Sequence, residues 1–128
     1  MRYLLDTHAL LLWWTDDSQL SPLARAAIEL QTNQILVSAA SACEIATKLR
    51  LGKLAEADEA VRRFNELVAA DGFEHLPISY LHALRAGNYE CQHRDPFDRM
   101  LAAQAELDAL VLLTCDPVFA ACGTRVAW

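Results

Sequence analysis

Four acidic residues are spaced along the sequence at positions that could bring their carboxylates together. Asp6 and Asp116 each follow a short apolar run, whereas Glu44 and Asp98 lie near the start of stretches with helical spacing. Carboxylate oxygens without a set of His or Cys ligands favour Mg²⁺ or Mn²⁺ over zinc. Such an ion lowers the pKa of a bound water, orients that water for attack on phosphorus and stabilises the leaving oxygen. These residues therefore suggest phosphodiester hydrolysis as the reaction class.

Each of these acids also has a purely structural explanation. Asp6 and Asp116 could cap the helices that follow them, and Asp98 could complement the dipole at the start of its helix. Ser41 and Glu44 match a capping box, in which the glutamate bonds back to the amide of the capping serine. For any single acid, capping is the better explanation. The argument for a metal site therefore depends on whether the fold gathers all four.

The segments between the acids alternate between predicted strands and predicted helices. Short apolar runs predict strands at residues 3–5, 35–37, 73–78, 110–113 and 125–128. Helical spacing and capping residues predict helices at residues 9–14, 22–30, 41–49, 57–71, 79–86 and 96–107, with a short helix from residue 117. We therefore expect one domain over residues 1–128, with a central, mostly parallel sheet that helices cover on both faces.

This arrangement would bring the acids to one edge of the sheet. Ligands of open parallel sheets bind beyond the carboxyl ends of the strands, where Asp6 and Asp116 lie. Glu44 belongs to the first turn of the helix after the second strand, so it reaches the same edge. Asp98 begins the helix that leads into the fourth strand, so its position depends on the loop before it. Carboxylates gathered there would raise one another's pKa values unless a cation lay among them.

The overall charge is unfavourable for binding a nucleic acid. The chain has 128 residues and a formal net charge of −6, whereas affinity for a phosphate backbone comes from Lys and Arg. Clustered acids that bind a metal ion would account for part of this charge. The densest basic stretch comprises Lys48, Arg50 and Lys53, and Arg94 and Arg99 form a second one. A solvated helix face explains these residues at least as well as contact with phosphate does.

Composition predicts a cytoplasmic protein that does not enter a membrane. No apolar run approaches the roughly 20 residues needed to span a bilayer, and the acidic Asp6 interrupts the first apolar segment. Cys43, Cys91, Cys115 and Cys122 lie in apolar or mixed segments and form no CxxC pair. This spacing argues against a zinc ribbon and against a disulfide framework, so we expect buried free thiols.

Four segments carry a more specific pattern, at residues 4–8, 41–44, 93–105 and 113–116. Together they resemble the successive signatures of PIN domains, most closely those of the VapC toxins of bacterial type II toxin–antitoxin modules. The resemblance spans essentially the whole chain. Its most specific part is the block Asp95-Pro96-Phe97-Asp98-Arg99.

The resemblance implies a three-layer α/β/α sandwich with Mg²⁺-dependent endoribonuclease activity. It also implies a homodimer, and a cognate antitoxin whose tail covers the active site. Asp6, Glu44, Asp98 and Asp116 correspond to the acidic quartet of the family, and Asp6 and Asp98 correspond to its direct metal ligands.

Several residues beside the acids have two explanations. The hydroxyl groups of Thr7 and Thr114 could orient a carboxylate or a water, and an ordinary bond to nearby backbone is about equally plausible. Arg99 could clamp a phosphate, but an ion pair with Asp95, four residues earlier on the same helix, is favoured. Asp95 itself is best explained as the helix cap.

Other functional classes are less consistent with these residues. A PIN-like module that only binds RNA or a partner protein has little reason to keep four carboxylates that repel one another. A phosphatase of the haloacid dehalogenase type would need a second aspartate two residues after Asp6, where the sequence has His8. A purely structural interaction protein would show no metal-dependent activity on any nucleic acid.

Overall fold

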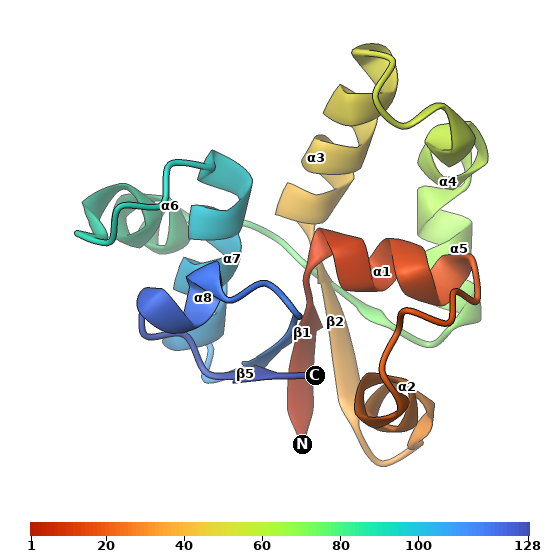
Figure 1. Cartoon of the computed structure of the whole chain (residues 1–128), viewed down its shortest axis with the longest axis horizontal. Helices are drawn as coiled ribbons and strands as arrows, with labels where there is room; N and C mark the ends of the chain where they lie inside the picture. Colours follow the sequence, from red (N-terminus) through yellow and green to blue (C-terminus); the bar gives the residue numbers. More distant parts are fainter.

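Five parallel strands form one sheet in the computed structural model, which describes residues 1–128. The strand order is β3-β2-β1-β4-β5, and all four strand pairings are parallel, as the alternating sequence pattern predicts (Figure 1). The strands are β1 (Arg2–Leu5), β2 (Gln34–Ser38), β3 (Glu74–Leu76), β4 (Val111–Leu113) and β5 (Val126–Ala127).

Helices occupy the connections between these strands. They are α1 (Thr7–Trp14), α2 (Pro22–Glu29), α3 (Ala39–Arg50), α4 (Asp58–Arg62), α5 (Phe64–Ala70), α6 (Tyr80–Asn88), α7 (Pro96–Leu107) and α8 (Val118–Ala121), with a 3₁₀ turn, η1 (Ala55–Ala57), before α4. None of them combines the length and the hydropathy that crossing a membrane requires.

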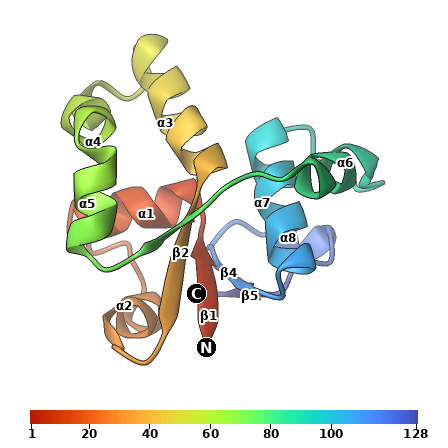
Figure 2. The same cartoon turned by 180° about the vertical axis from the view of Figure 1, so that it is seen from behind.

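Alternating side chains of the central strands divide the core into two clusters, one on each face of the sheet. Successive residues of a strand point to opposite faces. Leu4, Leu36 and Leu112 pack with α7 and α8, while Leu5, Val37 and Leu113 pack with α1, α2 and α5. Figures 1 and 2 show these helix groups on opposite sides of the sheet. The expected three-layer α/β/α sandwich is confirmed.

The order of the strands creates a switch point at the centre of the sheet. From β1 the chain proceeds outward through β2 to β3, and then returns to place β4 on the other side of β1. The Asp6 N–H donates to the Leu113 carbonyl at 3.2 Å, which continues the ladder one residue beyond β1. The connections therefore diverge above β1 and β4, which is where ligands bind in sheets of this kind.

Helix α3 begins three residues earlier than the capping-box pattern predicts. The cap is Ser38, whose Oγ accepts the Ala40 N–H at 2.9 Å and donates to Gln104 Oε1 at 2.5 Å. Ser41 is therefore a buried residue inside the helix, and Glu44 lies in the second turn. The predicted capping box is wrong because β2 runs directly into α3 without a loop, which makes Ser38 the first available cap.

The single helix predicted at residues 57–71 is two shorter helices. Arg63 separates them with a backbone conformation (φ −113°, ψ 19°) outside the helical range. Phe64, the first residue of α5, packs edge-on against Trp14 with ring centroids 5.3 Å apart. Gly72 follows the end of α5, close to the predicted helix end at residue 71, with a positive φ of 70° that glycine adopts without strain.

The expectation of four buried free thiols is wrong. Cys91 and Cys122 form a disulfide, with their Cα atoms 5.4 Å apart, although 31 residues separate them in the sequence. This bond joins the loop between α6 and α7 to the end of α8. Cys43 and Cys115 are free, but both are exposed. Spacing along the chain carried no sign of this pairing, because only the packing of α8 beside α7 brings the two segments together.

We expect the Ser38→Ala substitution to destabilise the fold by about 2 kcal/mol, since it removes a helix cap and leaves Gln104 Oε1 without its donor inside the core. Ser21→Ala is the matched control, because Ser21 caps α2 through the Ala24 N–H and has no second side-chain partner. The control should cost only about 1 kcal/mol. Urea denaturation measures both values, and equal losses would contradict the role given to the Ser38–Gln104 bond.

Candidate active site

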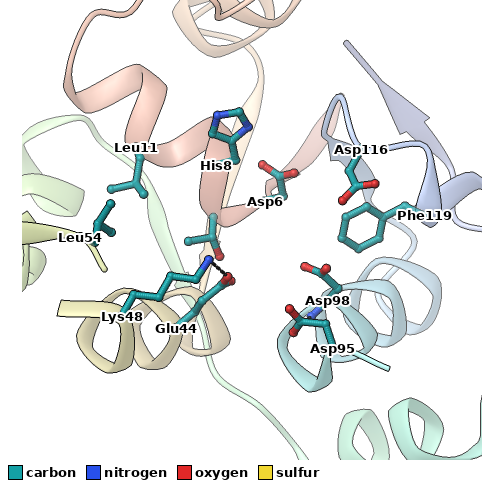
Figure 3. A pocket seen from close by; sticks show the side chains of 11 residues that line it. Asp6, His8, Leu11, Glu44, Lys48, Leu54, Asp95, Asp98, Asp116 and Phe119 are labelled. Atoms are coloured by element: carbon teal, nitrogen blue, oxygen red, sulfur yellow. Dashed lines mark hydrogen bonds and ion pairs between the residues drawn. The ribbon is translucent and has the colours of Figure 1, made fainter. Parts of the chain in front are cut away.

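A cleft of about 340 Å³ lies above the carboxyl edge of the sheet, between α1, α3 and α7 (Figure 3). All four predicted acids line it, together with Asp95 and one basic side chain, Lys48. Its lining comprises Asp6, Thr7, His8, Leu11, Glu44, Lys48, Leu54, Asp95, Asp98, Asp116 and Phe119. The fold therefore brings together five carboxylates from four separate segments of the chain.

Asp6 is buried at the centre of the cleft and both of its oxygens are bonded. Oδ1 accepts the Ala9 N–H at 2.6 Å, which makes Asp6 the cap of α1. Oδ2 accepts the hydroxyl hydrogen of Thr114. Burial raises the pKa of Asp6 above its ordinary value, and these two bonds only partly oppose the shift. Asp6 can therefore cap α1 and still bind a ligand in the cleft, since each carboxylate oxygen has a second lone pair.

Glu44 presents a buried oxygen that no group in the protein bonds. Its Oε2 accepts from Lys48 Nζ at 2.7 Å, one helical turn away along α3. Its Oε1 is buried without a hydrogen-bond partner. Buried polar atoms are bonded in nearly all native proteins, so an exception calls for an explanation such as a bound ion. Glu44 is therefore suited to receive a cation.

Asp98 has a raised pKa although a histidine bonds it. It lies in the first turn of α7, and its Oδ2 accepts from His93 Nε2 at 2.7 Å. Burial is the main reason why the pKa of Asp98 is raised from 3.8 to about 6; the hydrogen bond from His93 opposes the shift, and the charges of Asp95 and Glu44 add to it. Asp95 is the predicted cap of α7, accepting the N–H groups of Phe97 and Asp98. The repulsion shows that the carboxylates on α3 and α7 act on one another.

The loop after β4 supplies the last acid. Asp116 is exposed, its Oδ1 accepts the Val118 N–H at 3.0 Å, and its own N–H donates to Thr114 Oγ1 at 3.1 Å. The Thr114 hydroxyl therefore links the Asp6 side chain to the backbone of Asp116. The hydroxyl of Thr7 instead donates to Ser41 Oγ at 3.0 Å and makes no hydrogen bond to an acid. Of the two threonines, Thr114 is the one that orients a carboxylate.

The predicted ion pair between Arg99 and Asp95 is wrong. The Arg99 guanidinium donates to the backbone carbonyls of Ala86, Gly87, Tyr89, Cys91 and His93. Carbonyls at the end of a helix and in an irregular loop lack helical partners, and the planar fork of arginine can satisfy several at once. Arg99 thereby fastens the end of α6 and the following loop to α7. His93 belongs to this loop, so the same bonds help to place it beside Asp98.

The sequence did not predict which acids Lys48 and His93 contact. The spacing of Glu44 and Lys48 is that of a helical ion pair and could have indicated their contact. His93 flanks the predicted site, and a hydrogen-bonded histidine near the start of a helix is the favoured explanation from the sequence. Its partner Asp98 could not be named, because the approach of the two side chains depends on the irregular loop before α7.

The carboxylates fit a divalent metal ion, although they do not form a closed cage. No three His, Cys, Asp or Glu side chains lie close enough together to surround an ion. Mg²⁺ keeps several of its waters and needs only one or two carboxylates from the protein. The acidic donors are all oxygens, and Glu44 Oε1 has no other partner. This donor set suits a hard cation such as Mg²⁺ or Mn²⁺.

Comparison with known proteins identifies a family and a set of similar folds. The family model described as PIN domain matches residues 3–123. No curated protein matches the sequence.

Several solved structures share the fold at low sequence identity. A chain of VapBC2 from Rickettsia felis, bound to a DNA fragment from its promoter, matches with a TM-score of 0.72 and 15% identity, covering 100% of this chain and 99% of that one. DNA-bound VapBC from Salmonella typhimurium matches with a TM-score of 0.69 and 21% identity, covering 99% and 97%. FitAcB from Neisseria gonorrhoeae matches with a TM-score of 0.64 and 20% identity, covering 97% and 95%.

We expect Asp98→Asn to stabilise the metal-free protein at about pH 8 by on the order of 1 kcal/mol, after discounting for the solvent that still reaches this half-buried group. The folded state raises the pKa of Asp98, so the wild type loses stability as pH rises through about 6. Asparagine stays neutral and avoids this loss. The gain in stability should vanish below about pH 4, where the Asp98 carboxyl group is protonated in both the folded and the unfolded protein.

Urea denaturation in EDTA at the two pH values measures this difference. Asp58→Asn is the control, because Asp58 is an exposed carboxylate on α4 that pairs only with Arg62. A variant at Asp98 that is less stable than the wild type at the higher pH would contradict the electrostatic strain described here.

Proposed function

The chain belongs to the PIN domain family, and from this premise we propose that it is a metal-dependent endoribonuclease, the toxin of a type II toxin–antitoxin module. The observation that carries the proposal is the gathering of Asp6, Glu44, Asp98 and Asp116 around one cleft at the switch point of the sheet. A site without chemistry would not need carboxylates whose pKa values are raised by burial and by one another.

In this proposal Mg²⁺, or Mn²⁺ in its place, would bind among the four carboxylates through one or two of them directly and through its waters to the others. When bound, such an ion activates a water for in-line attack on phosphorus and stabilises the charge that develops on the leaving oxygen. The protein contributes the positions of the ligands. Thr114 and the Ala9 N–H fix the Asp6 carboxylate, and Glu44 offers its unpartnered Oε1. His93 orients Asp98 by bonding one of its oxygens.

We further propose that a cognate antitoxin covers this site and that the protein acts as a cytoplasmic homodimer. The similar structures include VapBC and FitAcB, which supports a protein partner of this type. An apolar groove of about 400 Å³ continues from the cleft and would suit such a polypeptide. Its apolar lining includes Leu11, Leu12, Trp14, Leu54, Ala57 and Ala60.

We expect Asp98→Asn to reduce cleavage of a mixed-sequence single-stranded RNA at least about a hundredfold, because it replaces a proposed metal ligand with a neutral amide. EDTA should abolish the activity of the wild type, and added Mg²⁺ or Mn²⁺ should restore it. Gel analysis of end-labelled RNA measures both effects.

The design separates chemistry from folding. Because Asp98→Asn is expected to be at least as stable as the wild type, unfolding cannot account for a loss of activity. Asp58→Asn, which removes an exposed carboxylate on α4, should cleave RNA normally. Full activity of the Asp98 variant would overturn the assignment. A wild type that binds RNA and metal without cutting any strand would identify a silent binding module instead.

A further inference from the structure

The cleft presents a charge problem for the substrate just proposed. Its lining contains five carboxylates, and Lys48 is the only lysine or arginine among the lining residues. An RNA strand carries a negative charge on every phosphate, and its binding depends on cations that neutralise those phosphates. Some group other than the acids must therefore attract the strand into this cleft.

Lys48 has the geometry for this role. Its Nζ lies 2.7 Å from Glu44 Oε2, which is its one hydrogen bond to another side chain. An ammonium carries three donors, so two remain for a ligand. The Lys48 side chain is 46% exposed while that of Glu44 is 7% exposed, so Lys48 is the more open partner of the pair. Figure 3 shows Lys48 reaching along α3 to Glu44 at the margin of the cleft.

Other positive side chains near the cleft cannot take this place. Arg99 uses its guanidinium on backbone carbonyls. Arg50, Lys53 and Arg94 are exposed and do not line the cleft. His93 is bonded to Asp98. His8 lines the cleft, but a histidine carries a full charge only when protonated, whereas a lysine stays charged throughout the neutral range.

We propose that Lys48 is a phosphate-binding residue that bridges Glu44 and a non-bridging phosphate oxygen of the bound RNA strand. Glu44 holds the ammonium in position through Oε2, and the two free donors bind the phosphate. The long aliphatic stem of Lys48 leaves the ammonium free to adjust to the strand. This inference rests on the proposed function, because it assigns the substrate contact of the same cleft.

A purely structural role for Lys48 makes a different prediction. If the ammonium only neutralised Glu44, its loss would change the stability of the fold and leave the salt dependence of RNA binding unchanged. If it binds phosphate, its loss removes one neutralised phosphate from the complex. For a single strand, the slope of log affinity against log salt concentration is negative, and this loss reduces its magnitude by about 0.7.

The test compares Lys48→Met and Lys48→Arg, both carrying Asp98→Asn so that the strand is not cut. Fluorescence anisotropy measures binding to a mixed-sequence single-stranded RNA in Mg²⁺ over a series of salt concentrations. Lys48→Met should bind about tenfold more weakly and show the reduced slope. Lys48→Arg should keep most of the affinity and the slope, because arginine also pairs with a carboxylate and a phosphate.

Arg62→Met is the matched control. Arg62 forms an ion pair with Asp58 at the same four-residue spacing, but on α4 outside the cleft. The control makes the same change in net charge and should leave the slope unchanged. Without the Asp98 substitution, Lys48→Met should raise the KM for RNA cleavage about tenfold with a smaller effect on kcat, as expected for a binding contact.

An unchanged slope for Lys48→Met, or an equal effect of Arg62→Met, would overturn the inference while leaving the proposed nuclease intact. A wild type that neither binds nor cuts RNA would instead overturn the proposed function, and the role of Lys48 with it.

Discussion

Carboxylates crowded into a partly buried cleft repel one another, and much of the surrounding structure serves to hold them there. Asp6 is kept in place by the Ala9 N–H and the Thr114 hydroxyl, Glu44 by Lys48, and Asp98 by His93. These bonds do not remove the cost completely, since burial, and to a smaller extent neighbouring carboxylates, still raise the pKa values of Asp6 and Asp98. A divalent cation would supply the missing positive charge, and so the strain in the metal-free protein is itself an indication of what the cleft binds.

The scaffold makes this crowding possible by two means. The strand order places β4 beside β1, so that Asp6 and Thr114 come from adjacent strand ends and meet directly. The approach of α7 to the same edge depends on a less regular device, in which Arg99 binds the carbonyls of the preceding loop and the Cys91–Cys122 disulfide ties that loop to the end of α8. Strand pairing therefore positions the side of the cleft formed by Asp6 and Thr114. The side formed by α7 is positioned by side chains that bind an irregular stretch of backbone.

The acidic character of the chain also has a local explanation. A net charge of −6 conflicts with RNA binding when it is spread over the whole protein. In the structure, five of the acids surround the cleft, where a metal ion would offset them, and the one lysine of the cleft faces the open side. The charges around the cleft therefore affect substrate binding more than the net charge of the protein does, because salt screens charges that lie more than about 10 Å away.

Hydrophobic periodicity and capping residues act over a few neighbours along the chain, so the alternating elements, the parallel sheet and the positions of Asp6 and Asp116 at strand ends could be predicted from the sequence. The start of α3 at Ser38, the bonds of Arg99, the disulfide and the contact of His93 with Asp98 became evident only in the folded chain. The placement of Asp98 at this edge could be expected only from the family resemblance, because an irregular loop of unpredictable path precedes its helix. The bonds of Arg99, the disulfide and the contact of His93 join segments that packing brings together, and residue spacing carries no record of such contacts.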